Sequence, residues 1–391
     1  MLDVASGRLT EQFRDRPGVE ARLADAIGRS WMTLGQHERA SEILELASAR
    51  LAAEHGDYDV RTIRARAELG VAYSFLARDD RALELLTQTA ADARSAFGGE
   101  SIEALDIEAM LASVFTNRGD YDEADKRLTR IVEAGERLAA SDVRHLAHLQ
   151  DLALARRGLG RFEEALELTQ EAYERSVELL GVEHWQTLQM AAAYGLELHS
   201  NTQFERAVEV LEPTYASLVE VFGERHPEAL RSSEHLAMAY LELSRFEEAN
   251  QMLAATHAAH TELFGPDHSV TLLSQRYQLQ ALSTMRADEE ALSLAADLVD
   301  RLERVEGPDH ESTIEALGQL GQLHAAVGNL EQAEAFEGEA VARAERVLPA
   351  THASRIQATL SLAGLPGESG RHCADAVDVL AYDGTARCRA R

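Results

Sequence analysis

Hydrophobic and small residues recur along this chain in a pattern with a period of about 42 residues. The clearest copy is LGRFEEA at 159–165, and related heptads end at alanines separated by 42, 42, 41, 42, 42, 42 and 42 residues. These marker alanines are Ala40, Ala82, Ala124, Ala165, Ala207, Ala249, Ala291 and Ala333. A length of 391 residues alone would suggest two or three globular domains, but this period predicts stacked supersecondary units instead.

The residues around each marker predict a helix, a tight turn and a second helix. A small residue lies twelve positions before the marker, with Leu279 the one exception, and it allows two helix axes to approach closely. A leucine follows most markers by four residues, which is one helical turn. The small residues are Gly28, Gly70, Ala112, Ala153, Gly195, Ala237 and Gly321, and the leucines are Leu44, Leu86, Leu128, Leu211 and Leu253. Glycines at 35, 119, 160 and 328 are placed to end the first helix in a left-handed conformation.

One helical pair cannot bury its apolar stripe alone, so the pattern predicts an all-α stack of neighbouring pairs. We expect repeats at 19–58, 59–100, 101–142, 143–183, 184–225, 226–267, 268–309 and 310–351. Residues 1–18 carry an apolar stripe that predicts a capping helix, broken by Pro17 before Val19 begins the first repeat. Residues 352–391 resemble a degenerate ninth repeat, stopped early at Pro366 and Gly367 and followed by a polar tail.

Charge and cysteine content narrow the classes of partner and compartment. The formal net charge of -29 argues against broad binding to nucleic acid or to an anionic membrane. Cys373 and Cys388 are the only cysteines, so we expect a reducing compartment and no disulfide framework. The opening MLDVASGRLT lacks the apolar core of a signal peptide, and no run reaches the ~20 apolar residues of a membrane span. We therefore expect a cytoplasmic protein, and the abundance of Ala and Arg suggests a GC-rich bacterial source.

The repeat pattern resembles the tetratricopeptide repeat in its long, kinesin-light-chain form. The connectors LGVEHWQTL at 180–188, FGERHPEAL at 222–230, FGPDHSVTL at 264–272 and EGPDHESTI at 306–314 resemble that family's Gly-x-x-His-Pro-x-Thr-Leu link. FGGESIEAL at 97–105 lacks the histidine, and the connector near Ser141 departs further. The resemblance implies a right-handed α-solenoid of about eight to nine repeats, with extended peptides or partner helices held in its concave groove.

Residues 1–35 also resemble the segment that opens the repeat region of certain bacterial serine/threonine protein kinases. The chain itself has no Gly-rich loop, His-Arg-Asp loop or Asp-Phe-Gly motif. The resemblance implies that the chain corresponds to the repeat half alone.

Several histidines invite a metal-binding interpretation. His184, His226, His268, His310 and His352 recur every 42 residues, but equivalent positions lie about two helix diameters apart, so helix capping is the better prediction. The pairs His145 with His148 and His257 with His260 are each one turn apart. Without a third ligand at matching spacing, they predict a solvated helix face. No metal or cofactor is therefore expected.

Catalysis is not expected either. The sequence contains no Gly-x-Ser-x-Gly, His-Glu-x-x-His or Walker motif. Trp31 and Tyr73 occupy the same repeat position, which predicts a core slot rather than an aromatic binding platform.

A binding surface is predicted by the spacing of polar residues in each first helix. Positions 18, 15, 11, 8 and 7 before the marker fall on one helix face, away from the core of the repeat. The candidate binding residues on it are Arg22, Arg29, Arg64, Asn117, Gln150, Arg157, Gln189, His199, Arg231 and Arg276. The same face also carries Gln280 and Gln322, and the acids Asp25, Asp106, Glu234, Glu242 and Glu315.

Six arginines against five acids make this face relatively basic in an acidic chain, most of all in the first two repeats. Because the guanidinium fork suits carboxylate or phosphate, we predict that the face recognises an acidic or phosphorylated peptide. The alternative is that these arginines pair with neighbouring acids and bind nothing.

Three classes of function remain, ranked in this order: a protein-interaction scaffold, a regulatory module of a kinase or transcription factor, and an enzyme. The shortened last repeat would leave an apolar end face incompletely covered, which makes that end a candidate surface for self-association.

Overall fold

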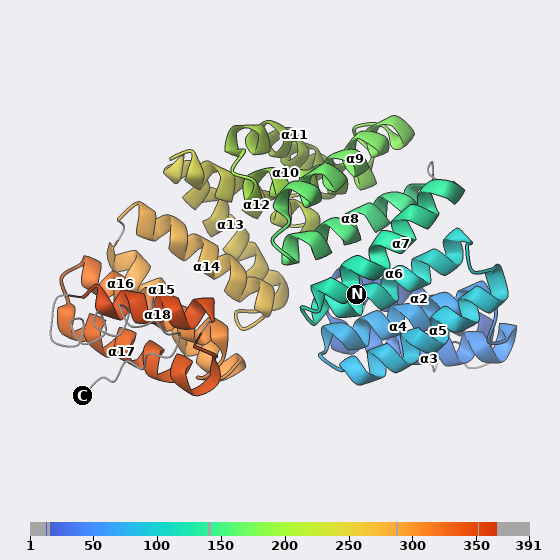
Figure 1. Ribbon diagram of the computed structural model, residues 1–391, viewed down its shortest axis with the longest axis horizontal. Helices are drawn as coiled ribbons and strands as arrows, with labels where there is room; N and C mark the ends of the chain where they lie inside the picture. Colours follow the sequence, from blue (N-terminus) through green and yellow to red (C-terminus); the bar gives the residue numbers. More distant parts are fainter. Residues whose placement is uncertain (1–12, 14–15, 140–141, 287, 351, 366–391) are drawn as a thin grey trace. The chain divides into compact units, whose positions relative to one another are not determined.

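The computed structural model describes residue 13 and residues 16–139, 142–286, 288–350 and 352–365. The chain divides into two compact units, Met1–Val221 and Phe222–Arg391, called unit 1 and unit 2 below. All regular structure in the described residues is α-helical, from α2 to α18 (Figure 1). The predicted all-α, helix-turn-helix class is confirmed.

Unit 1 contains five helical pairs. They are α2 (Pro17–Thr33) with α3 (His37–His55), α4 (Val60–Phe75) with α5 (Asp79–Phe97), α6 (Ile102–Asn117) with α7 (Tyr121–Ala139), α8 (Val143–Gly158) with α9 (Phe162–Leu180), and α10 (Trp185–Ser200) with α11 (Phe204–Phe222), whose last residue falls in unit 2.

Unit 2 contains three helical pairs and one further helix. They are α12 (Pro227–Glu242) with α13 (Phe246–Phe264), α14 (Ser269–Thr284) with α15 (Asp288–Val305), and α16 (Glu311–Ala326) with α17 (Leu330–Val347), followed by α18 (Ala353–Ala363).

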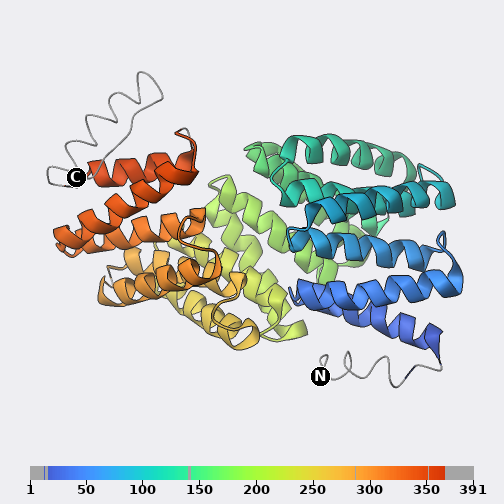
Figure 2. The ribbon, with the colours of Figure 1, turned by 90° about the horizontal axis from the view of Figure 1, so that it is seen from below.

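Within each unit the helices lie side by side in chain order (Figures 1 and 2). Each helix from α2 to α9 packs on the one that follows it, and so does each helix from α12 to α17. First helices also contact the first helix of a neighbouring pair, as α4 and α6 do in unit 1 and α16 and α18 in unit 2. No two second helices of the described chain are in comparable contact. The first helices therefore line the inner wall of each unit.

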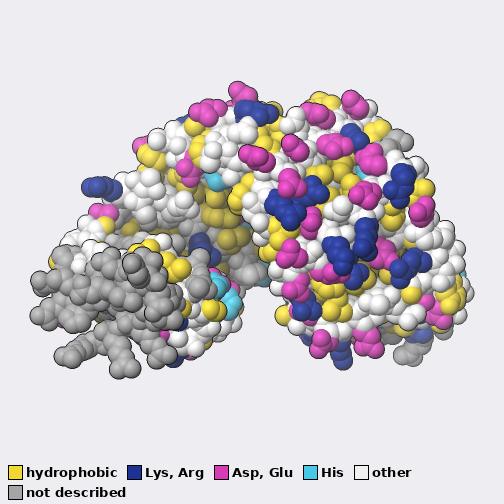
Figure 3. Space-filling view, in the orientation of Figure 1, with side chains coloured by type: hydrophobic (Ala, Val, Ile, Leu, Met, Phe, Trp, Pro, Cys, Tyr) yellow, Lys and Arg dark blue, Asp and Glu magenta, His cyan; other side chains and the backbone are white. Residues whose placement is uncertain are grey.

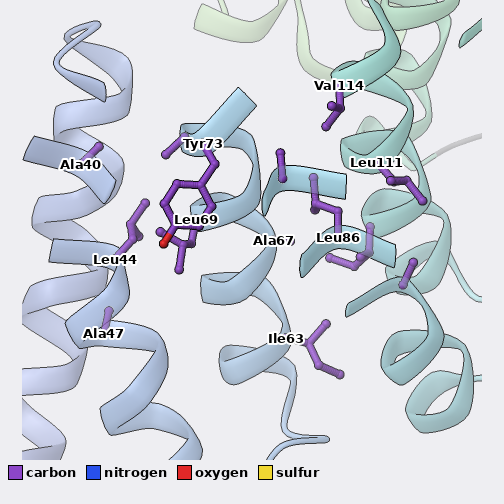
Figure 4. Packing of buried hydrophobic residues seen from close by; sticks show 14 of the residues in the cluster. Ala40, Leu44, Ala47, Ile63, Ala67, Leu69, Tyr73, Leu86, Leu111 and Val114 are labelled. Atoms are coloured by element: carbon purple, nitrogen blue, oxygen red, sulfur yellow. The ribbon is translucent and has the colours of Figure 1, made fainter. Parts of the chain in front are cut away.

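The packing of each pair depends on the small residue and the leucine that the period predicts. A Cβ atom on Gly28 would lie 2.6 Å from Cγ of Leu44, and one on Gly70 would lie 2.5 Å from Cγ of Leu86. Both leucines are fully buried, and Figure 4 shows them among the other core side chains. The missing Cβ is thus what allows the leucine to enter the neighbouring helix surface.

The last complete pair of unit 2 uses a different residue in the leucine position. Gly321 faces Glu337, whose Cγ would lie 2.7 Å from an added Cβ. The Glu337 side chain is 1% exposed, and burial raises its pKa to about 8. A carboxyl group therefore occupies the slot that Leu44 and Leu86 fill in their pairs.

The turn between the two helices of each pair contains one residue with positive φ. Gly35, Gly119, Gly160 and Gly328 have φ between 68 and 84°, which confirms the predicted left-handed helix ends. The equivalent residues of the other four pairs are Ala77, Thr202, Ser244 and Arg286, with φ of 54 to 60°. These four turns hold a residue with a Cβ in a conformation that glycine adopts more easily.

Four of the five recurring histidines cap helices through their side chains, as predicted. Nδ1 of His184, His226, His268 and His310 accepts a hydrogen bond of 3.3 Å from the backbone N–H two residues later. Asp59, Ser101 and Asp142 are the N-caps of earlier first helices. His352 is the N-cap residue of α18 but makes no side-chain capping bond.

The first described helix begins at Pro17, two residues before the expected start at Val19, because proline is well suited to the first turn of a helix. Of the expected capping helix over 1–18, residues 1–12 and 14–15 lie outside the described residues. The same is true of Cys373, Cys388 and the second helix of the degenerate ninth repeat. None of the described helices is long and apolar enough to cross a membrane.

Candidate functional site

The candidate site is the surface of the first helices that lines the inner wall of each unit. Arg22, Arg64 and Arg231 are exposed there, whereas Arg29, Arg157 and Arg276 are half-buried. Cationic and anionic side chains are interspersed over the face of unit 1 that Figure 3 shows.

Four of the six arginines pair with neighbouring acids, which is what the alternative interpretation expects. Arg29 lies 2.7 Å from Asp25, Arg157 lies 3.5 Å from Glu197, and Arg276 lies 2.8 Å from Glu315. Arg231 pairs with Glu228 one turn away. Glu197 is buried, and this raises its pKa to about 7, with Arg157 opposing the rise. These pairs occupy guanidinium groups that a ligand would otherwise meet.

Arg22 and Arg64 differ from these four arginines in their surroundings. Nε of Arg22 donates to the backbone oxygen of Gly18 at 3.1 Å. Arg64 lies near Asp25 and Glu68, and burial raises the pKa of both carboxyls while Arg64 and Arg29 oppose that rise. Both guanidinium groups remain open to solvent on adjacent first helices of unit 1.

The predicted uncharged residues of the face differ in their exposure and in the contacts of their side chains. Asn117 is exposed, and its Nδ2 donates to Oγ of Ser74 at 3.1 Å, which links α6 to α4. Gln150 and Gln189 are half-buried. The His199 ring lies 5.3 Å from that of Phe204, so it contributes to the packing of its own pair.

The spacing used to predict this face missed one position, which lies fourteen residues before each marker alanine. That position lies one helical turn after the position eighteen before the marker, so an i, i+4 rule finds it. It contributes Glu68 and Asp151 in unit 1 and Tyr277 and Gln319 in unit 2. With both acids included, carboxylates outnumber arginines on the face as a whole, so its basic character is confined to the first two repeats.

Unit 2 presents two adjoining hollows on its inner wall. One has a volume of about 470 Å³ and lies among α14, α16 and α18, and the other has about 540 Å³ and lies between α14 and α16. Both are lined by Arg276, Gln319 and Gln322. Amides and hydroxyls are the commonest polar side chains around them, and the lining also includes Arg276, Glu315 and the apolar Leu273, Leu279 and Leu323.

Three of the four paired histidines are buried and His257 is half-buried, so the predicted solvated helix face is wrong. His145 and His148 are 0% and 2% exposed, and their Nε2 atoms lie 2.6 Å from Glu136 and 3.0 Å from Asp106. His260 is also buried, and burial lowers its pKa to about 4. The error arises because each of these helices has a neighbour on both sides: α8 packs between α7 and α9, and α13 packs between α12 and α14. Within the described ranges, no group of three or more His, Cys, Asp and Glu side chains is arranged to hold a metal ion.

Trp31 and Tyr73 are buried, 6% and 8% exposed, as a core position requires. The guanidinium of Arg39 lies 4.9 Å above the Trp31 ring, and that of Arg81 lies 5.9 Å above the Tyr73 ring. These rings therefore belong to the packing of their pairs.

Comparison with known proteins agrees with this architecture. Two tetratricopeptide-repeat family models match the chain, one at residues 280–346 and the other at 145–186 and 230–269. No curated protein matches it significantly.

Three solved structures illustrate the likeness. A putative kinesin light chain with nearly identical TPR-like repeats, from Podosopora anserina, is 25% identical and covers 52% of this chain and 98% of its own, with a TM-score of 0.45. BtubC (BKLC) from P. vanneervenii is 18% identical over 58% of this chain and 91% of its own, with a TM-score of 0.50. A signal transduction ATPase with numerous domains and a tetratricopeptide repeat sensor, from Pyrococcus horikoshii, is 13% identical, with a TM-score of 0.54, and covers 87% of this chain and 52% of its own.

The family matches fall on the helical pairs that the period predicts, and the structures at TM-scores of 0.50 and 0.54 share the fold. The chain is therefore built of tetratricopeptide repeats, and solved repeats named kinesin light chain are among its structural neighbours.

Proposed function

We propose that the chain is a protein-interaction scaffold whose first-helix face holds a segment of a partner protein. Tetratricopeptide repeats support a role in protein binding. The inner wall of each unit carries polar side chains that are exposed or half-buried on neighbouring helices, so one extended segment can contact several repeats at once.

In unit 1 the preferred segment is acidic or phosphorylated. The observation that carries this proposal is the pair of exposed guanidinium groups on adjacent first helices, Arg22 on α2 and Arg64 on α4. A ligand carboxylate or phosphate would give each of them a charge-assisted hydrogen bond, which is stronger than a bond between neutral groups. Asn117, on the next first helix, adds an amide to the same wall.

Peptide binding to the full chain tests this proposal. We expect acidic peptides to bind more tightly than neutral peptides of equal length, and Arg22→Ala with Arg64→Ala to weaken the acidic peptides at least tenfold, since hydrogen bonds to charged groups contribute about 1.5–3 kcal/mol. Arg130→Ala with Arg137→Ala is the matched control, because both arginines are exposed on the second helix α7. Equal affinity for acidic and neutral peptides, unchanged in the Arg22 and Arg64 variant, would overturn the proposal.

A second candidate function is a regulatory or sensor module of a kinase or transcription regulator. Two observations favour it: the likeness of residues 1–35 to a kinase-associated segment, and the fold shared with a repeat sensor at a TM-score of 0.54. A kinase reading frame immediately upstream in the source genome would support this function, and an isolated reading frame would count against it.

A further inference from the structure

Exposed apolar side chains gather at one edge of unit 1, where one second helix ends and the next first helix begins. Leu179 in the last turn of α9, Val182 in the following turn and Trp185 at the start of α10 are all exposed. Val221 is exposed in the last turn of α11, which lies beside the start of α10 because these two helices form an antiparallel pair. Large apolar side chains exposed close together are typical of interaction sites. Residues 179–185 and 220–221 are called the connector edge below.

Other repeats carry a recurring ion pair at the equivalent edge. The residue 24 before the marker alanine pairs there with the residue 13 after it, at the end of the second helix. The pairs are Glu100 with Arg137, Arg225 with Glu262, Asp267 with Arg304, and Asp309 with Arg346. Nitrogen and oxygen lie 3.9, 2.7 and 3.4 Å apart in the first three. The sign reverses between repeats, so the repeat geometry brings the two positions together whatever charge they carry.

The connector edge departs from this rule because both of its equivalent positions are acidic. They are occupied by Glu183 and Glu220, which are exposed and have no ion-pair partner among the described residues. Between Arg175 and Arg225 the sequence has a single Lys or Arg, Arg206, and its guanidinium donates to the Tyr194 hydroxyl at 2.7 Å. Two carboxylates at neighbouring positions repel each other, and a cation placed between them would relieve that repulsion.

The groups of the connector edge suit a cationic side chain with apolar neighbours. The exposed ring of Trp185 attracts an ammonium or guanidinium group over its face, and Glu183 and Glu220 can accept charge-assisted hydrogen bonds from it. Leu179, Val182 and Val221 offer apolar contacts to the stem of a Lys or Arg and to the side chains beside it. Tryptophan is also enriched among the residues that dominate binding energy at protein interfaces.

We infer that the connector edge binds a basic segment of a partner protein in which Arg or Lys side chains lie beside apolar ones. Trp185, Glu183 and Glu220 are its main contacts. None of the connector-edge residues belongs to the candidate site, so the inference adds a surface of opposite charge preference to the proposed scaffold. A chain with both surfaces would hold an acidic segment at Arg22 and Arg64 and a basic segment at this edge.

The test measures the affinity of the full chain for synthetic peptides of arginine and leucine in two arrangements, alternating and at helical spacing. We expect at least one arrangement to bind, and Trp185→Ala to weaken it about tenfold or more. Because Trp185 is exposed and Trp31 is buried, we also expect tryptophan emission to shift to shorter wavelength as the peptide covers the Trp185 ring. The same peptides with glutamine in place of arginine bind more weakly.

A matched pair of charge reversals separates this site from the general acidity of the chain. Glu220→Arg gives Glu183 the opposite charge that the other repeats have, so we expect it to weaken the peptide about tenfold or more without disturbing the fold. Glu209→Arg changes the net charge equally at an exposed position of the same helix, about three turns away, and leaves the affinity nearly unchanged. Circular dichroism checks that each variant is folded.

Three results would overturn the inference: neither arrangement binds, Trp185→Ala binds as well as the unaltered chain, or Glu209→Arg weakens the peptide as much as Glu220→Arg. The last result would show a general attraction to an acidic protein. Arg22→Ala with Arg64→Ala leaves the affinity for the basic peptide unchanged, whereas it weakens acidic peptides. Failure of this inference is therefore distinguishable from failure of the proposed function.

Discussion

Unit 1 and unit 2 have the same helical architecture but place different chemistry in equivalent positions. On the inner wall, the first two repeats of unit 1 expose Arg22 and Arg64, whereas the hollows of unit 2 are lined by amides, hydroxyls and leucines around the paired Arg276 and Glu315. In the core, Leu86 fills the slot beside Gly70, whereas Glu337 fills the slot beside Gly321. The period therefore determines where the side chains lie, whereas the residue type at an equivalent position differs from one repeat to another.

The largest expected effect concerns the leucine slot of unit 1. Leu86→Ala removes a fully buried side chain whose partner is a glycine, so neighbouring atoms cannot easily fill the cavity. We expect a loss of about 2–5 kcal/mol in the free energy of unfolding, measured by urea titration with circular dichroism. Leu179→Ala is the control, because Leu179 is 41% exposed, and an equal loss in both variants would contradict the packing role.

A smaller effect is expected at the corresponding slot of unit 2, and it depends on pH. Because the pKa of Glu337 is raised to about 8 in the folded chain and an ordinary Glu has a pKa of about 4.3, its neutral form is favoured by folding. Its contribution to stability is fully present below the ordinary pKa and is lost as the pH rises through about 8.

We expect Glu337→Leu to stabilise the chain by on the order of 2 kcal/mol at pH 8 and by less at pH 5. Urea titrations at the two pH values measure this difference. Glu331→Leu on the same helix is the control, since Glu331 is exposed. A gain that does not change with pH would show that the Glu337 carboxyl does not titrate in the folded chain.

The smallest of the three effects concerns the turns. Thr202 has a φ of 58°, a strained conformation for a β-branched residue, whereas the equivalent Gly35 is relaxed at 68°. We expect Thr202→Gly to stabilise the chain by about 1 kcal/mol and Gly35→Ala to destabilise it by a similar amount. Thermal unfolding monitors both variants, and destabilisation by Thr202→Gly would show that the Thr202 side chain makes a compensating contact.

Much of the fold was predictable from the sequence because it depends on local, repeated relations. The marker alanines, the small residue twelve before and the leucine four after them place helix against helix, and the structure has these residues buried. Glycines predicted the left-handed turns at Gly35 and Gly328. Ala77 and Arg286 adopt the same conformation because the surrounding pair imposes it, which their side chains alone do not reveal.

The candidate site was less predictable because it depends on contacts between neighbouring repeats. His145 is buried through contacts with the preceding pair, including Glu136 on α7, and no single-helix pattern contains that information. The pairing of Arg276 with Glu315 joins residues 39 apart, on the first helices of successive repeats. Gly318 resembles the structural Gly321 in the sequence, and only the open space beside it shows that it forms the floor of a hollow.

The central claim is that the first-helix face of unit 1 binds an acidic segment through Arg22 and Arg64. The most direct measurement is the affinity of one acidic and one uncharged peptide of equal length for the full chain, for Arg22→Ala with Arg64→Ala, and for Arg130→Ala with Arg137→Ala. We predict that the first double variant weakens the acidic peptide alone, that the second leaves both affinities unchanged, and that added salt weakens only the acidic peptide. Equal affinity of the two peptides for the full chain, or no loss in the first double variant, would contradict the claim.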